Sequence, residues 1–189
     1  MLEKLKAYLQ SHQETFEATF TEEFLKEVAT IGNLIGDALE CGNKVIFMGN
    51  GGSAADSQHL AAEFVSKLSI DRAPLAAIAL TTDTSALTAI GNDYGFEKIF
   101  ERQVLAVARE GDVLVGISTS GNSRNVKLGF LSGSKLGLTN IGLSGNKGFS
   151  DVELTNELVV QSKITAHIQE AHIFIGHLLC AIAEERFLK

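Results

Sequence analysis

The chain has 189 residues, of which 45% are hydrophobic and 21% charged, as is typical of one compact globular domain. Its net charge of −7 argues against nucleic acid or an anionic membrane as a partner, because both are bound by clustered lysine and arginine. No apolar run approaches the ~20 residues of a membrane helix, and no signal-peptide pattern opens the chain, so we expect a cytoplasmic protein. Cys41 and Cys180 lie in apolar helical patterns and are expected to be buried and unpaired.

From residue 2 to residue 39 the apolar side chains recur at helical spacing, which predicts two helices before the rest of the fold. Short apolar runs then alternate with helical patterns up to a last helix at about 164–187. Continuous apolar strands separated by helices favour a parallel sheet covered on both faces. We therefore expect a single α/β domain over residues 1–189, with N-terminal helices in 1–41. The expected strands are 45–48, 76–80, 113–117, 139–143 and, as a possible fifth, 158–160.

Two unusual loops, 50–53 and 118–123, follow the first and third expected strands. In a parallel sheet, ligands bind beyond the carboxyl ends of the strands, where both loops fall. The glycines of the first loop allow close approach of an anion to the backbone and to the start of the next helix. The second loop has four hydroxyls and no lysine, which suits a sugar phosphate. The alternative is that both loops are ordinary helix caps. Neither is a Walker A or dinucleotide motif.

Polar residues on two helices are candidates for chemistry. His59 and Glu63 lie four positions apart and project from one helix face, as an acid–base pair, two metal ligands or an ordinary surface contact. Gln169 and His177 lie roughly 80° apart around the last helix and can share a broad face. His177 stands in an apolar stretch, where a histidine needs a partner. Spacing alone does not assemble these four residues into one site.

Five segments in fixed order resemble the motif series of the phosphoheptose isomerases, which belong to the sugar isomerase (SIS) superfamily. The resemblance runs from the N-terminal helices to the last helix, and the ordered series makes it specific. The segments are GNGGSAAD at 49–56, ALTTD at 79–83, IGNDYGF at 90–96, GISTSGNS at 116–123 and IQEAH at 168–172.

This resemblance implies a flavodoxin-like parallel sheet, one zinc ion per subunit, and a homotetramer with active sites between subunits, in which residues 1–41 pack at an interface. It also implies interconversion of sedoheptulose 7-phosphate and D-glycero-D-manno-heptose 7-phosphate, the entry step to the heptoses of bacterial surface polysaccharides. The implied zinc ligands are His59, Glu63, Gln169 and His177, and the implied acid–base residues are Glu63 and His177. The implied substrate-binding residues are Asn50, Gly51, Gly52, Ser53, Glu63, Asn92, Asp93, Ser118, Thr119, Ser120, Ser123 and Gln169.

These residue types suit an enediol reaction, which needs a base at carbon, an acid at the neighbouring oxygen and stabilisation of negative charge. Glu63 is a plausible base and His177 a plausible acid, although a carboxylate bound to zinc is a weaker base. Two histidines and a carboxylate are acceptable zinc ligands, while a glutamine ligand is less usual.

Two positions depart from the family pattern. Lys67 and His167 stand where the family has arginine, so a two-pronged grip on oxyanions is lost at both. These departures leave open an isomerase for another phosphosugar. A second alternative, from a different class, is a non-catalytic SIS domain that binds a phosphosugar or a protein partner. Such a module has no reason to keep the four candidate metal ligands together.

Overall fold

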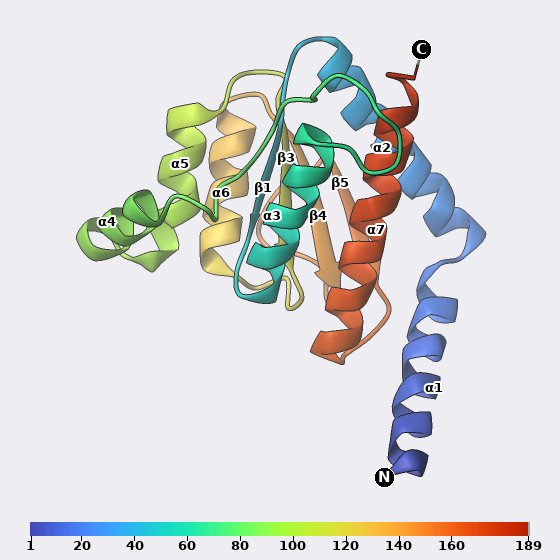
Figure 1. The fold of residues 1–189 in the computed structure, drawn as a ribbon. Coiled ribbons are helices and arrows are strands. Elements are labelled where there is room, and N and C mark those ends of the chain that lie inside the picture. Colours follow the sequence, from blue (N-terminus) through green and yellow to red (C-terminus); the bar gives the residue numbers. More distant parts are fainter. Residues whose placement is uncertain (189) are drawn as a thin grey trace.

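The structure, a computed structural model, describes residues 1–188 and contains one five-stranded sheet (Figure 1). All neighbouring strands are parallel and their order is β2-β1-β3-β4-β5, which confirms the expected flavodoxin-like sheet. The edge strand β2 is shorter than predicted, and the possible fifth strand is present and longer. The strands are β1 (Val45–Gly49), β2 (Ala77–Ala79), β3 (Val113–Ser118), β4 (Thr139–Gly145) and β5 (Asn156–Val160).

Two helices precede the sheet, as the apolar periodicity predicts, and helices cover both of its faces (Figure 1). Thr21 separates the first two helices and caps the second, since its hydroxyl accepts a hydrogen bond from the Phe24 amide at 3.2 Å. The helices are α1 (Leu2–Thr19), α2 (Glu22–Glu40), α3 (Gly52–Val65), α4 (Thr84–Tyr94), α5 (Ile99–Val107), α6 (Arg124–Lys135) and α7 (Thr165–Glu185), with a 3₁₀ turn η1 (Phe96–Lys98) before α5.

Alternate residues of each central strand enter two separate cores. Val45 and Phe47 of β1 pack on the face covered by α2, α3 and α7, whereas Ile46 and Met48 pack on the face covered by α5 and α6. Because both faces are covered, every residue of β1 and β3 is buried, and the strands are continuously apolar instead of alternating. The two cores fix the carboxyl ends of the strands, where the candidate loops lie.

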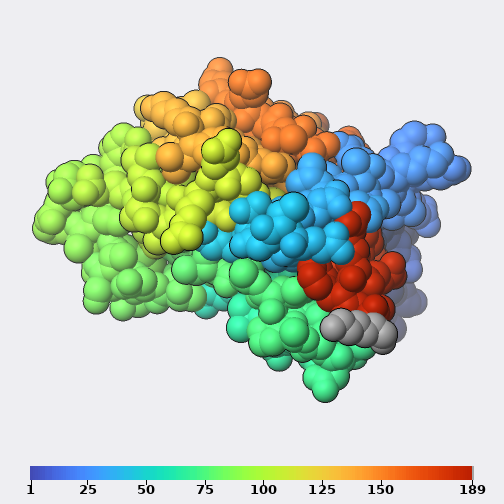
Figure 2. All heavy atoms as spheres, turned by 90° about the horizontal axis from the view of Figure 1, so that it is seen from above, coloured from blue at the N-terminus to red at the C-terminus, as the bar shows by residue number. Residues whose placement is uncertain are grey.

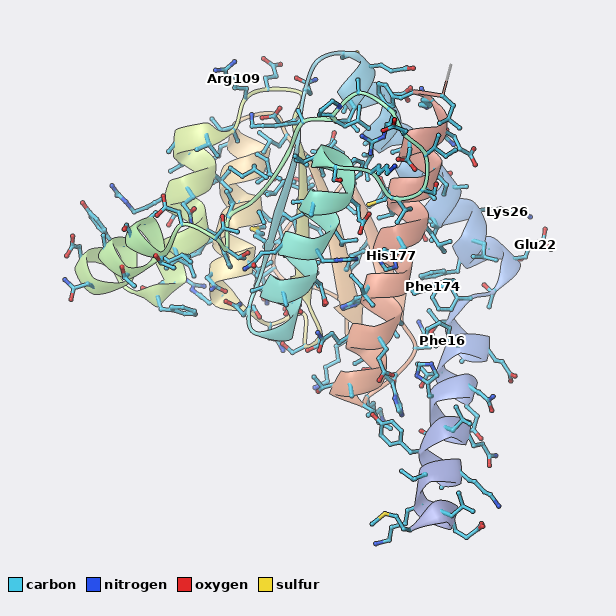
Figure 3. All side chains as sticks on the ribbon, viewed as in Figure 1. Phe16, Glu22, Lys26, Arg109, Phe174 and His177 are labelled. Carbon is cyan, nitrogen blue, oxygen red and sulfur yellow. The ribbon has the colours of Figure 1, made fainter. Side chains whose placement is uncertain are left out.

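The two ends of the molecule are less enclosed than this centre. The N-terminal turns of α1 extend past α7 at one end, and α4 projects at the other (Figure 1). Figure 3 shows Phe16 of α1 directed towards Phe174 of α7, with ring centroids 5.6 Å apart. Every residue of α4 is at least partly exposed. Among residues 1–188, no helix has the length and apolar character needed to cross a membrane.

The expected burial is confirmed for Cys180 and wrong for Cys41. Cys180 is buried within α7, and burial raises the pKa of its thiol. Cys41 is exposed because it follows α2 at a position roughly 200° around the helix from the buried Leu39, away from the apolar stripe.

The 66–76 segment lies against the end of α7, at the end of the molecule opposite the candidate loops (Figure 2). Here Arg72 ion-pairs with the buried Glu184 at 3.0 Å and donates hydrogen bonds to the backbone carbonyls of Glu63 and Phe64, each at 2.9 Å. The carbonyls at the end of α3 are thereby satisfied. Arg72 thus fixes the last turn of the helix that carries Glu63.

Candidate active site

The two candidate loops lie side by side at the point where the chain changes direction across the sheet. β1 leads through α3 to one edge and β3 leads through α6 towards the other, so a crevice opens between their carboxyl ends. Gly51 caps α3 at φ +58°, a conformation that favours glycine. Gly121 turns the second loop at φ +66°, and a Cβ there would overlap the backbone of Gly148. Both turns therefore depend on glycine for their shape.

The hydroxyls of the second loop converge on one another. Ser118 Oγ lies 2.9 Å from Ser123 Oγ and 3.5 Å from Ser120 Oγ. Ser123 is the N-cap of α6, but its hydroxyl is directed to Ser118 and not to the amides of the helix. The alternative that this serine serves only to cap the helix through its side chain is therefore excluded. The cluster presents hydroxyls at the positive end of α6, an arrangement suited to a phosphate group.

An amide pair that the sequence did not reveal joins the two loops. Asn50 and Asn125 each donate to the other's carbonyl oxygen, at 2.9 and 2.8 Å. Both residues line a pocket of about 540 Å³ together with Ser123 and Phe96. Asn50 is a predicted site residue, whereas Asn125 lies just beyond the hydroxyl loop and was not predicted. The pair holds the glycine loop and the hydroxyl loop at a fixed separation.

Two lysines also lie beside the hydroxyl loop, although that loop contains none. Lys147 follows β4 and Lys163 precedes α7, and both line a hollow of about 330 Å³ with Thr119 and Ser120. These cations come from loops that carry no recognisable phosphate motif, so sequence reasoning missed them. They add positive charge to a chain whose net charge is −7.

His59, Glu63 and His177 meet between α3 and α7. The Nε2 atoms of His59 and His177 lie 2.8 Å apart, and His59 Nε2 lies 3.2 Å from Glu63 Oε1. Figure 3 shows His177 on the side of α7 that faces α3. The helices approach closely here, as shown by Gly176: an added Cβ on this residue would lie only 2.5 Å from the Leu60 side chain. One ligand atom from each of the three polar residues lies within 4.8 Å of the others.

These three side chains fit a divalent metal. Two imidazole nitrogens and one carboxylate oxygen match the donor set of zinc sites that keep an open position. Two ring nitrogens directed at each other need either a shared proton or a cation between them. The His59 side chain is 49% exposed and Glu63 16%, so the group is reachable from solvent.

Gln169 lies on the α3 side of α7, as its spacing from His177 predicts, and its amide contacts two residues of α3. A Cβ on Gly52 would overlap this amide, and its nitrogen lies 3.4 Å from Asp56 Oδ1. Asp56 is 8% exposed, and its Oδ2 has no hydrogen-bond partner within residues 1–188. Burial raises the pKa of Asp56, opposed by the Gln169 hydrogen bond and by His59. Asp56 is therefore an unpredicted member of the site that joins Gln169 to the histidine cluster.

Asn92 and Asp93 are not brought to these loops within one chain. Both are exposed on α4, which packs mainly against η1 and α5, and Asn92 donates to the Asp93 carboxylate at 2.7 Å. Lys67 is also exposed, just beyond the end of α3. Ser53, in contrast, is buried in the first turn of α3. The other predicted substrate-binding residues lie on the two loops or between α3 and α7.

A buried histidine of α7, His172, contacts the carboxyl-terminal part of strand β4. The Nε2 of His172 lies 3.1 Å from the carbonyl oxygen of Ser144 in β4. Burial lowers the pKa of His172 to about 4, partly offset by that backbone contact. The ring is therefore neutral at neutral pH and donates to the carbonyl.

Known proteins share this arrangement of loops and helices. The SIS domain family model matches residues 7–145. The phosphoheptose isomerase of Geotalea daltonii is 50% identical over 187 residues, which cover 98% of this chain and 97% of that protein. This chain belongs to the phosphoheptose isomerase family of SIS domain proteins. Another family member, from Aquifex aeolicus, is 49% identical over 186 residues, with 98% and 97% covered.

Solved structures of the phosphoheptose isomerase family agree with the fold. The Neisseria gonorrhoeae enzyme superposes with a TM-score of 0.88 at 41% identity, over 97% of this chain and 98% of that one. The Francisella tularensis enzyme superposes with a TM-score of 0.92 at 35% identity, with the same coverage. The likeness therefore extends over the whole fold, including the helices that carry the candidate site.

Proposed function

We propose that this chain is an aldose–ketose isomerase that interconverts sedoheptulose 7-phosphate and D-glycero-D-manno-heptose 7-phosphate. The observation that carries the proposal is the convergence of His59, Glu63 and His177 at α3, the helix that begins at the glycine loop. A non-catalytic binding module would need the phosphate loop but not this cluster. The reaction supplies heptose phosphate for bacterial surface polysaccharides, and we place it in the cytoplasm.

In the proposed reaction Glu63 is the base and His177 the acid. The Glu63 carboxylate removes a proton from C1 of the ketose while His177 protonates the oxygen on C2, which gives a neutral enediol. His177 then takes the proton from the C1 oxygen as Glu63 returns one to C2, so the carbonyl moves to C1 with no net gain or loss of atoms. His59 contacts both side chains and keeps them in position relative to each other.

We further propose that His59, Glu63 and His177 hold one zinc ion per subunit, with Gln169 as a fourth ligand. When bound, zinc polarises the sugar carbonyl and stabilises the negative charge that develops on oxygen. Gln169 reaches the same helix, α3, one to two turns before His59 and Glu63. The hydroxyls of Ser118, Thr119, Ser120 and Ser123 and the glycine loop 50–53 bind the phosphate and hold the sugar in place.

Exposed residues of α1 and α4 support a homotetramer with active sites between subunits. α1 exposes apolar side chains, with Leu2 64%, Leu5 59% and Leu9 56% exposed, which a subunit contact would cover. Asn92 and Asp93 are exposed on α4 and hydrogen-bond to each other, so we assign them to the substrate site of a neighbouring chain. Light scattering should give a tetramer, and a monomer with full activity would contradict this assembly.

A panel of ketose phosphates tests the activity and the substrate together. We expect turnover of sedoheptulose 7-phosphate to exceed that of pentulose and hexulose phosphates, measured by aldose formation. Lys67 is exposed beyond the end of α3 and His167 is buried against Tyr8, so neither departure from the family pattern lies in the loops described above. Preference for another ketose phosphate would assign a different substrate, and no turnover with any of them would favour a binding module.

A further inference from the structure

A second histidine–carboxylate cluster lies between α1 and α7, separate from the one that faces α3. His12 of α1 places its Nδ1 2.7 Å from Oε2 of Glu170, and Nδ1 of His167 lies 3.4 Å from the same oxygen. One ligand atom from each of the three residues lies within 4.8 Å of the others. Two ring nitrogens from helices far apart in the sequence thus converge on one carboxylate oxygen.

The burial of this cluster is uneven. The His167 side chain is fully buried, and its Nε2 has no hydrogen-bond partner among residues 1–188. Leaving a polar ring atom buried without a partner is unfavourable unless the rest of the ring makes a strong interaction. His12 and Glu170 are 29% and 46% exposed, so an ion can enter from solvent. Tyr8 packs over His167 at 4.7 Å between ring centroids and covers the other side.

We propose that His12, His167 and Glu170 form a second divalent-metal site, for which zinc is the chemical match. Two imidazole nitrogens and a carboxylate oxygen are a zinc donor set, with water as the fourth ligand. Neighbouring ligand atoms around tetrahedral zinc are about 3.3 Å apart at ordinary bond lengths. The contacts of His12 and His167 with Glu170, 2.7 and 3.4 Å, lie on either side of that value, so small side-chain movements suffice.

The ion at this second site has a structural role. α1 packs mainly against α7 and β5, and its first turns are exposed. A metal held by one residue of α1 and two of α7 therefore fixes the N-terminal helix to the helix that carries Gln169 and His177. Gln169 and Glu170 are consecutive, yet the first contacts α3 and the second contacts α1.

Zinc content of the full-length protein, stripped with chelator and reloaded, tests this proposal separately from the proposed function. Elemental analysis should find two zinc ions per chain in the wild type. His12→Gln and Glu170→Gln should each retain one, His59→Ala should also retain one, and the double variant His12→Gln/His59→Ala none. Glu17→Gln, an exposed carboxylate on α1 outside the cluster, is the matched control and should retain two.

Cobalt provides a second readout that does not depend on turnover. Co²⁺ loaded into His59→Ala should still give visible absorption bands, and these should disappear when His12→Gln is added. A single zinc that is lost in His59→Ala and unaffected by His12→Gln would overturn the second site and leave the active-site metal intact. A single zinc with the reverse pattern would support the second site and contradict the active-site metal. Absence of zinc from the wild type would contradict both.

Discussion

α7 carries two histidine–carboxylate clusters on different faces, and they differ in what surrounds them. The α3-facing cluster of His59, Glu63 and His177 includes a half-exposed histidine, and two of its members lie on the helix that begins at the glycine loop. The α1-facing cluster of His12, His167 and Glu170 is covered by aromatic rings and contains a fully buried histidine. We therefore assign similar donor atoms to different tasks: the first cluster, on the helix that begins at the glycine loop, acts on substrate, whereas the second joins two helices.

The largest expected difference between the clusters is in catalysis. Glu63→Gln removes the proposed base, and kcat/KM should fall by roughly 10²–10⁴-fold because acid–base catalysis contributes that much. Glu170→Gln, the same change in the other cluster, should lower kcat/KM by no more than a few-fold. Steady-state kinetics with sedoheptulose 7-phosphate measure both, with circular dichroism to verify folding. Equal losses in the two variants would show that the clusters do not have separate roles.

A third histidine of α7, His172, should control stability rather than activity. Its pKa of about 4 in the folded protein lies below the unfolded value of 6.5, so the unfolded chain binds the proton more tightly. Stability is therefore fully present above pH 6.5 and is lost as the pH falls towards 4, by up to about 3 kcal/mol. Urea unfolding between pH 5 and 7 should show this slope in the wild type and a smaller one in His172→Gln. An unchanged slope would assign the pH dependence to other groups.

The close approach of α3 and α7 can be tested by adding one methyl group. A Cβ at Gly176 would lie 2.5 Å from Leu60, so Gly176→Ala should push the helices apart and cost about 1–3 kcal/mol of unfolding free energy. Activity should fall as well, since His177 moves away from His59. Gly91→Ala in α4 is the control: an added Cβ there meets nothing within 4 Å, and alanine favours a helix. Destabilisation by Gly91→Ala alone would contradict this view of the interface.

The smallest expected effect concerns Asp56, which belongs to the α3-facing cluster through Gln169 and His59. Its folded-state pKa is raised, so the charged carboxylate costs stability once the pH exceeds the unfolded value. Asp56→Asn should therefore raise the melting temperature at pH 7, by a few degrees. It should also lower activity, because the contact that orients Gln169 changes. Asp71→Asn, at an exposed position, should alter neither quantity, and a fall in the melting temperature of Asp56→Asn would contradict the raised pKa.

Local patterns were sufficient for most of the fold. The residues of β3 are apolar without alternation because both faces of the sheet are covered. This pattern could be recognised in the sequence without knowing which strands pair with β3. β2 was less well defined: it is an edge strand with three paired residues, so packing constrains its sequence less. The exposure of Cys41 follows from its phase, roughly 200° around the helix from the buried Leu39, which the apolar composition of the segment alone does not report.

The site was harder to predict because its contacts link distant segments. The spacing of His59 and Glu63 places them on one face, but their contact with His177 depends on how α3 packs against α7. The Asn50 partner Asn125, the lysines beside the hydroxyl loop and the pairing of His12 with Glu170 arise in the same way. The family resemblance supplied roles for His59, Glu63 and His177, whereas only three-dimensional packing revealed their remaining neighbours.

Because residues of both clusters lie on α7, few changes in the sequence or length of this helix can be tolerated. Within this helix, only Thr165, Ala166, Glu170, Phe174 and Glu185 are exposed, so few positions are free to drift. Deleting one residue between Gln169 and His177 would rotate everything beyond it by about 100°. Gln169 would keep its place against α3, while His177 would turn away from His59. The length of this segment is therefore as constrained in evolution as its composition.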